Sequence, residues 1–142
     1  MVSERGFKAM NSAHRLLLKA TRGRLGWRAI GMPVLELTTV GRRSGHQHTI
    51  MLTSPVRDGT SIVLVASRGG DDRHPDWFLN LRAQPDVEVR LRGGAWRPMR
   101  ARVATEAERD RLWPRVVAGN RVYEGYQRKS KRLIPLVLLE PR

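Results

Sequence analysis

Two arginines and a serine lie between two glycines in a short stretch that has the chemistry of an anion-binding turn. The stretch is Gly41-Arg42-Arg43-Ser44-Gly45, between two runs of β-branched and apolar residues. Its glycines let a ligand approach the backbone, while the guanidinium groups and the hydroxyl can donate hydrogen bonds to phosphate or carboxylate. The nearest acid before Arg42 is Glu36, so we expect both arginines to be available to a ligand. An ordinary exposed basic hairpin has the same composition and is the alternative.

A second turn of this kind, Ser67-Arg68-Gly69-Gly70, ends the almost continuously apolar run 62–67. Two basic, glycine-containing turns that each leave a strand favour one anionic ligand contacted at several places. A dinucleotide-like or flavin-like cofactor that carries phosphate has this chemistry. His46 and His48 would point to the same face of a strand, as two metal ligands can, but no carboxylate or third histidine lies nearby. We therefore predict no metal site.

The sequence lacks the motifs of several common catalytic sites. It has no cysteine, which excludes thiolate-bound zinc, iron–sulfur clusters and cysteine nucleophiles. The patterns GxGxxG, GxxxxGK(S/T), GxSxG and HExxH are also absent. The acidic residues are scattered, so we find no pair of carboxylates on one face for acid–base hydrolysis.

Hydrophobic periodicity predicts the elements that must hold these turns. Helices are expected over 4–21, 75–83 and 123–131. A further helix starts at Thr105, where Glu108 completes a capping box, and Pro114 limits or kinks it. Short, mostly antiparallel strands with peripheral helices predict an α+β fold that closes into a small barrel. The expected strands are 34–40, 47–54, 62–67, 87–92, 99–103 and 133–139, with a turn at 57–60.

Length and composition favour a single domain over residues 1–142, with a basic amphipathic helix and loop at 1–33 and the barrel at 34–142. Hydrophobic residues make up 40% of the chain, which is enough for a core. No apolar run is long enough to span a bilayer and no secretory leader is visible, so a cytoplasmic protein is expected.

The net charge is +14, and 23 of the 27 basic residues are arginine. Arginine suits bidentate binding of phosphate and carboxylate, so the partner classes are an anionic ligand, a nucleic acid or an acidic membrane surface. An arginine-rich proteome would produce the same excess. The helix over 4–21 either lies on an anionic membrane or packs on its own domain. Nucleic-acid binding is not expected, because the aromatic residues are not interleaved with arginines.

Four blocks of the chain together resemble the deazaflavin (coenzyme F420)-dependent nitroreductase family, and they occur in the family's order and spacing. The resemblance extends from about Val34 to Leu139. The blocks read LTTVGRRSG at 37–45, VASRGG at 65–70, HPDWFLNL at 74–81, and YEGYQ with RLIP at 123–127 and 132–135.

This resemblance implies a split β-barrel that binds the reduced 8-hydroxy-5-deazaflavin coenzyme F420, whose phosphodiester and oligoglutamate tail are anionic. It implies catalytic roles for Ser67 and Tyr126, beside the ring and the substrate. It further implies cofactor contacts from Arg42, Arg43, Ser44, His48, Met51, Thr53, Ala66, Ser67, Arg68, Gly69, Trp77, Asn80 and Tyr123.

The chain departs from the family pattern at three of these positions. His48 stands in place of the usual arginine, Met51 in place of proline and Arg68 in place of lysine. The change at His48 weakens an anion contact at neutral pH, because histidine is mostly neutral there. Trp77 and Asn80 share a helix face by their spacing of three, for which core packing and a helix-end hydrogen bond are the alternatives.

The reaction that the resemblance implies is hydride transfer from reduced F420 to a quinone, an activated enone or a nitroaromatic. Ser67 and a tyrosine hydroxyl would polarise this acceptor, and Tyr123 and Tyr126 would cover it. Asn120 stands at a third position that is aromatic in the family, which affects substrate choice. The alternatives are an FMN-type flavin protein and a non-catalytic basic module for membrane or nucleic acid.

Overall fold

The structure is a computed structural model that describes residues 28–29, 32–91 and 93–142. The helix predicted over 4–21 lies outside these residues. The described chain forms one antiparallel sheet in the order β1-β2-β6-β7-β8-β5-β4, with β3 paired to β2. The strands are β1 (Arg28–Ala29), β2 (Met32–Val40), β3 (Gln47–Thr53), β4 (Val56–Asp58), β5 (Ser61–Val65), β6 (Asp86–Leu91), β7 (Arg97–Val103) and β8 (Leu136–Pro141).

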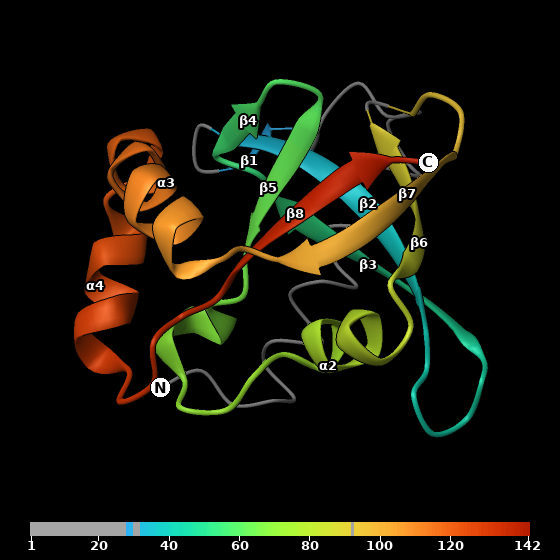
Figure 1. Ribbon diagram of the computed structural model, residues 1–142, viewed down its shortest axis with the longest axis horizontal. Coiled ribbons are helices and arrows are strands. Elements are labelled where there is room, and N and C mark those ends of the chain that lie inside the picture. The colour runs from blue at the N-terminus through green and yellow to red at the C-terminus, as the bar shows by residue number, and fades with distance from the viewer. Residues whose placement is uncertain (1–27, 30–31, 92) are drawn as a thin grey trace.

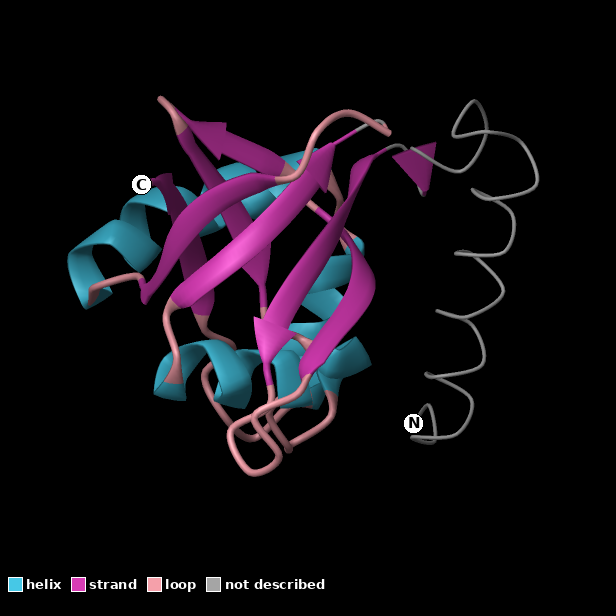
Figure 2. Ribbon diagram, turned by 90° about the vertical axis from the view of Figure 1, so that its right-hand side faces the viewer, coloured by secondary structure: helices cyan, strands magenta, loops and turns pink. Residues whose placement is uncertain are grey.

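The sheet curls into an open barrel, and the helices lie beside it and at one end (Figures 1 and 2). The helices are α2 (Asp76–Ala83), α3 (Glu106–Gly119) and α4 (Val122–Lys129), with a 3-10 turn η1 (Arg68–Gly70) after β5. The predicted α+β split barrel of antiparallel strands is therefore confirmed. None of the helices in this described part is long and apolar enough to cross a membrane.

Some strands of the barrel alternate buried and exposed residues, whereas others are buried on both faces, and two hydrophobic clusters explain the difference. In β6 and β7, alternate residues such as Val87, Val89 and Met99 face the barrel interior, where they pack with Phe78 of α2. In β5 and β8, by contrast, four consecutive residues are buried, at 62–65 and 136–139. The reason is that α3 and α4 cover the outer face of these two strands. There Val63 packs in a second hydrophobic cluster with residues of both helices, such as Leu112 and Tyr123.

The capping box predicted at the start of α3 is present, but Pro114 does not end the helix. Thr105 Oγ1 accepts from the Glu108 amide at 3.2 Å, and the Glu108 carboxylate accepts from the Thr105 amide at 2.9 Å. Pro114 lies inside α3, which continues to Gly119.

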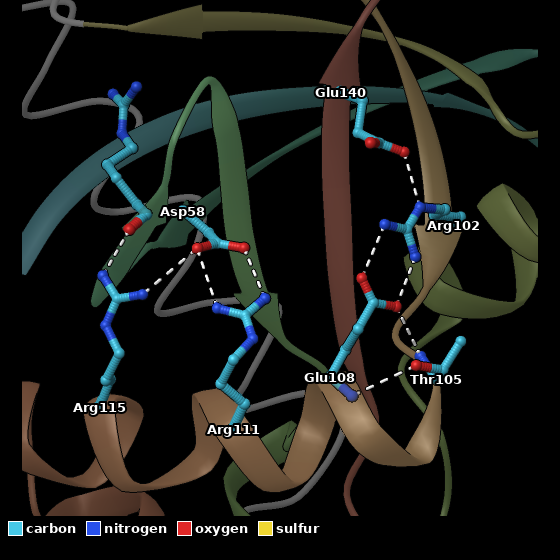
Figure 3. A network of polar contacts seen from close by, with 8 residues as sticks. Asp58, Arg102, Thr105, Glu108, Arg111, Arg115 and Glu140 are labelled. Carbon is cyan, nitrogen blue, oxygen red and sulfur yellow. Dashed lines mark hydrogen bonds and ion pairs between the residues drawn. The ribbon is translucent and has the colours of Figure 1, made fainter.

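Ion pairs hold α3 on the barrel (Figure 3). Arg102 of β7 donates to both carboxylate oxygens of Glu108 and to Glu140 of β8. Further along the helix, Arg111 and Arg115 both donate to Asp58 of β4. The helix is therefore joined to β7 and β4 by arginine–carboxylate contacts, and Arg102 also links β7 to β8.

Two predicted strands are shorter in the structure. The last one begins at Leu136 rather than residue 133, because the Ile134 amide donates to the Gln127 side chain at 2.9 Å and Pro135 has no amide to donate. The third ends at Val65, and the chain turns at Ser67. Residues 57–58, expected in a turn, belong to β4.

Candidate functional site

The first glycine–arginine turn is a compact hairpin between β2 and β3. The Gly41 amide donates to the His46 carbonyl at 2.7 Å, and the Gly45 amide donates to the Gly41 carbonyl at 2.9 Å. A Cβ at position 41 would lie 2.6 Å from Ser44 Oγ and 2.9 Å from His48 Nε2. A side chain at position 41 would therefore displace Ser44 or His48, and the turn brings these two predicted site residues together over Gly41.

Arg42 is held by helix α2, so the expectation that no acid neutralises it is wrong. Its amide and Nη1 donate to Asn80 Oδ1 at 3.2 and 2.8 Å, and its Nη2 lies 3.5 Å from Asp76 Oδ1. Asp76 is 34 residues further along the chain, so only packing brings it near. Within the described part of the chain, Arg43 has no ion pair and is exposed. Arg43 is therefore the arginine of this turn that remains available to an anion.

The second turn has an unusual backbone. Arg68, Gly69 and Gly70 have φ of 47°, 66° and 87°, and the left-handed conformation costs a non-glycine residue roughly 1–2 kcal/mol. A Cβ at Gly70 would lie 3.0 Å from both the Cα and the carbonyl oxygen of Tyr126. The missing side chain lets α4 pack directly on the turn, which brings Tyr126 beside the segment that starts at Ser67.

Two side chains of this second turn differ in how they are held. The Arg68 guanidinium pairs with Asp71, three residues on. Ser67 is buried, and its hydroxyl makes no hydrogen bond to another described residue. The Ser67 hydroxyl is thus the group at this turn that can donate to a ligand oxygen.

Arg132, to which no sequence motif assigned a role, holds the second turn from the far side. Its Nη2 donates to the carbonyls of Ala66 and Ser67 at 2.9 and 3.0 Å, and its Nε donates to the Asp71 carbonyl at 3.1 Å. Burial lowers the pKa of Arg132. Burial also lowers the pKa of His74, and the nearby charge of Arg132 lowers it further. Arg132 lies about 65 residues from its partners, and no local pattern indicates the contact.

The two tyrosines of α4 lie in contact but have different surroundings. Tyr123 is buried, its hydroxyl lies 3.0 Å from Thr53 Oγ1, and burial raises its pKa, so it stays protonated at neutral pH. The half-buried Tyr126 ring packs edge-to-face against it, with ring centres 6.0 Å apart. This places Thr53, Tyr123 and Tyr126 in one chain of contacts.

Three residues predicted as cofactor contacts are buried among core side chains. Trp77 is 6% exposed and packs edge-to-face with Phe78 in the barrel interior. Met51 is 4% exposed, and Ala66 is fully buried. Trp77 therefore packs in the core, which was the alternative to a cofactor contact. The Asn80 side chain accepts hydrogen bonds from Arg42 rather than from a helix end.

The site as a whole is one end of the barrel. The β2–β3 turn, α2 and η1 with α4 all lie at the lower end in Figure 1, at the opposite end from the β4–β5 turn. Among the described residues, this end offers the Arg43 guanidinium, which has no ion pair there, and hydroxyl groups, which suit an anionic ligand and an acceptor oxygen. No group of three or more potential metal ligands occurs among the described residues.

Comparison with known proteins identifies relatives that match nearly the whole chain. The sequence pattern of F420H(2)-dependent quinone reductases matches residues 11–141. An F420H(2)-dependent quinone reductase of Mycobacterium tuberculosis is 37% identical over 135 residues, which are 91% of this chain and 88% of that protein.

Solved structures agree with this match. The structure of an F420-H2-dependent reductase has a TM-score of 0.68 at 35% identity, covering 76% of this chain and 94% of that one. A second structure, described as a domain-swapped dimer, has a TM-score of 0.70 at 30% identity and covers 97% of this chain and all of that one.

Proposed function

The chain belongs to the F420H(2)-dependent quinone reductase family, and on this premise we propose that it transfers a hydride from reduced F420 to a quinone. The observation that carries the proposal is the family match over residues 11–141. The placement of both glycine–arginine turns at one barrel end supports it. An activated enone or a nitroaromatic is an acceptor of the same electron-poor kind.

The residues at this end fit an anionic deazaflavin. Arg43 is exposed and unpaired among described residues, and Ser44 and His48 lie together over Gly41. We assign these three side chains to the anionic part of the cofactor. Arg42 shapes the turn, because Asn80 and Asp76 hold its guanidinium. The bound cofactor supplies the hydride, and the protein supplies binding and orientation.

The hydroxyls of Ser67 and Tyr126 are the proposed contacts to the quinone oxygen. A donated hydrogen bond stabilises the negative charge that grows on this oxygen as hydride arrives at the quinone. A proton must follow to complete the quinol, and it comes from Tyr126 or solvent. Tyr123 stays protonated and holds Thr53, so its role is to fix α4.

A titration with F420 and FMN side by side tests the proposal. We expect saturable F420 binding, and oxidation of reduced F420 that depends on added quinone. Arg43→Gln should weaken F420 binding about tenfold or more, because it removes one charge-assisted contact of about 1.5–3 kcal/mol. The control Arg128→Gln removes an exposed arginine of α4 that has no ion pair among described residues, and should bind as the parent does.

Preferential binding of FMN would support the flavin alternative. Binding of neither compound would contradict the enzyme proposal and favour a non-catalytic basic module.

The N-terminal helix remains a sequence-based proposal. Residues 4–21 have a basic amphipathic pattern, and we propose that they place the enzyme against the inner face of an anionic membrane, where lipid quinones are found. We also keep two predictions from the sequence. One is a single domain with an N-terminal segment 1–33 and a barrel 34–142, and the other is a cytoplasmic location.

A further inference from the structure

A cavity opens at the end of the barrel opposite to the proposed active site. Its volume is about 440 Å³, which is within the usual range for small-molecule sites. It lies where the β4–β5 turn, the start of β7 and the C-terminal end of β8 meet (Figure 1). Ile62, near the start of β5, lines the cavity, whereas Ser67 follows the end of β5, so the two sites lie at opposite ends of this strand.

The inner wall of the cavity is apolar. Ile62, Val89 and Met99 line it, and all three belong to the hydrophobic core of the barrel. Each is at most 5% exposed. Such a wall suits a hydrocarbon chain, because the apolar surface of a bound chain would be removed from water there.

The same cavity is also lined by three arginines in unequal states. Arg142 is used by the fold: its Nε donates to the Met99 carbonyl at 3.0 Å and its Nη2 lies 3.3 Å from Glu88 Oε1. Arg57 and Arg97 are exposed, and neither has a carboxylate partner within the described residues. By contrast, Asp58, next to Arg57, is already held by two arginines of α3.

We propose that this cavity binds an amphipathic anion, with a carboxylate or phosphate head at Arg57 and Arg97 and an acyl chain against Ile62, Val89 and Met99. The anionic head would pair with two guanidinium groups that have no carboxylate partner among the described residues. The acyl chain would contact the apolar wall of the cavity. The head-and-chain chemistry occurs in free fatty acids and in anionic membrane lipids. The proposal is independent of the proposed reaction, because it uses no residue of the other barrel end.

Calorimetric titration of the full chain with decanoate, in the absence of F420, tests the proposal. We expect one saturable site, and at least a tenfold loss of affinity in the double variant Arg57→Gln/Arg97→Gln. The double variant Arg121→Gln/Arg128→Gln loses the same charge outside the cavity and should bind within twofold of the parent. Acetate, which has the head without the chain, and decyl maltoside, which has the chain without the charge, should bind far more weakly.

Methionine methyl resonances locate the ligand. The Met99 methyl signal, assigned with Met99→Leu, should shift on adding decanoate, and the Met51 signal, from a methionine that does not line the cavity, should not. The proposal is overturned if decanoate does not saturate, if the arginine variant binds it as the parent does, or if the neutral detergent binds equally well.

Sedimentation with anionic phospholipid vesicles then identifies the source of the ligand. Loss of vesicle binding in Arg57→Gln/Arg97→Gln, together with loss of decanoate binding, identifies a membrane lipid. Unchanged vesicle binding with loss of decanoate binding identifies a free carboxylate.

Discussion

At the scale of single residues, Arg132 decides the shape of the second turn. Its guanidinium donates to three carbonyls, those of Ala66, Ser67 and Asp71. Lysine is a point charge that cannot span these acceptors in a fixed plane. Arg132→Lys should therefore misplace the Ser67 hydroxyl and lower kcat for quinone reduction about tenfold or more, while F420 affinity changes little.

Arg109→Lys is the matched control for this prediction. Arg109 also donates to a carbonyl, that of Ile134 at 2.9 Å, and to the Gln127 side chain, but it does not touch the second turn. Both variants should lose stability to urea, by about 1–3 kcal/mol, and only Arg132→Lys should lose turnover. Equal loss of turnover in both variants would show that Arg132 acts only through stability.

At the scale of elements, Glu108 couples the start of α3 to the barrel. Hydrogen bonds from Arg102, and then from the Thr105 amide, lower the pKa of Glu108 from its usual 4.5 to about 2. A carboxylate whose pKa is lower in the folded state stabilises the fold above pH 4.5, and this contribution is lost as the pH falls through about 2. The pair is partly exposed, so its contribution is about 1 kcal/mol or less.

Glu108→Gln isolates the charge, because glutamine can also complete a capping box. The variant should unfold more easily than the parent near pH 7, by about 0.5–1 kcal/mol, and the difference should disappear in acid. Urea unfolding across this pH range measures it. The control Glu106→Gln changes an exposed acid in the same helical turn, one with no ion pair in the described part of the chain. A difference that persists undiminished in acid would contradict the role of the charge.

At the scale of the whole molecule, positive charge is the dominant property, and the N-terminal segment carries a share of it. Residues 1–20 contain four basic residues, Arg5, Lys8, Arg15 and Lys19, and one acid. Each basic residue near an anionic surface contributes about 1 kcal/mol. Deleting residues 1–20 should therefore lower binding to anionic vesicles by two orders of magnitude or more, and should spare turnover of a water-soluble quinone.

A full-length variant with these four residues changed to glutamine guards against misfolding of the shortened chain, and should show the same loss in vesicle sedimentation. Vesicle binding that survives both changes would contradict the membrane proposal for this segment.

Much of the fold was predictable because its signals are short-range. The alternation in β6 and β7, the continuous apolar runs of β5 and β8, and the Thr105–Glu108 box all lie within a few residues. Such patterns follow from the repeat of a strand or the geometry of one helical turn. The anion-binding chemistry of the 41–45 turn could be recognised in the same way, because glycine, arginine and serine are adjacent in the chain.

Tertiary structure alone decided which of these groups are available. Asp76 and Asn80 hold Arg42 and leave Arg43 unpaired among described residues, and Arg132 orients the Ser67 turn. The same packing buries Trp77 and brings β4, β7 and β8 together around a second cavity. These contacts join residues 34 to 66 positions apart. They depend on how the sheet curls and on which helix covers which face, and no local pattern carries that information.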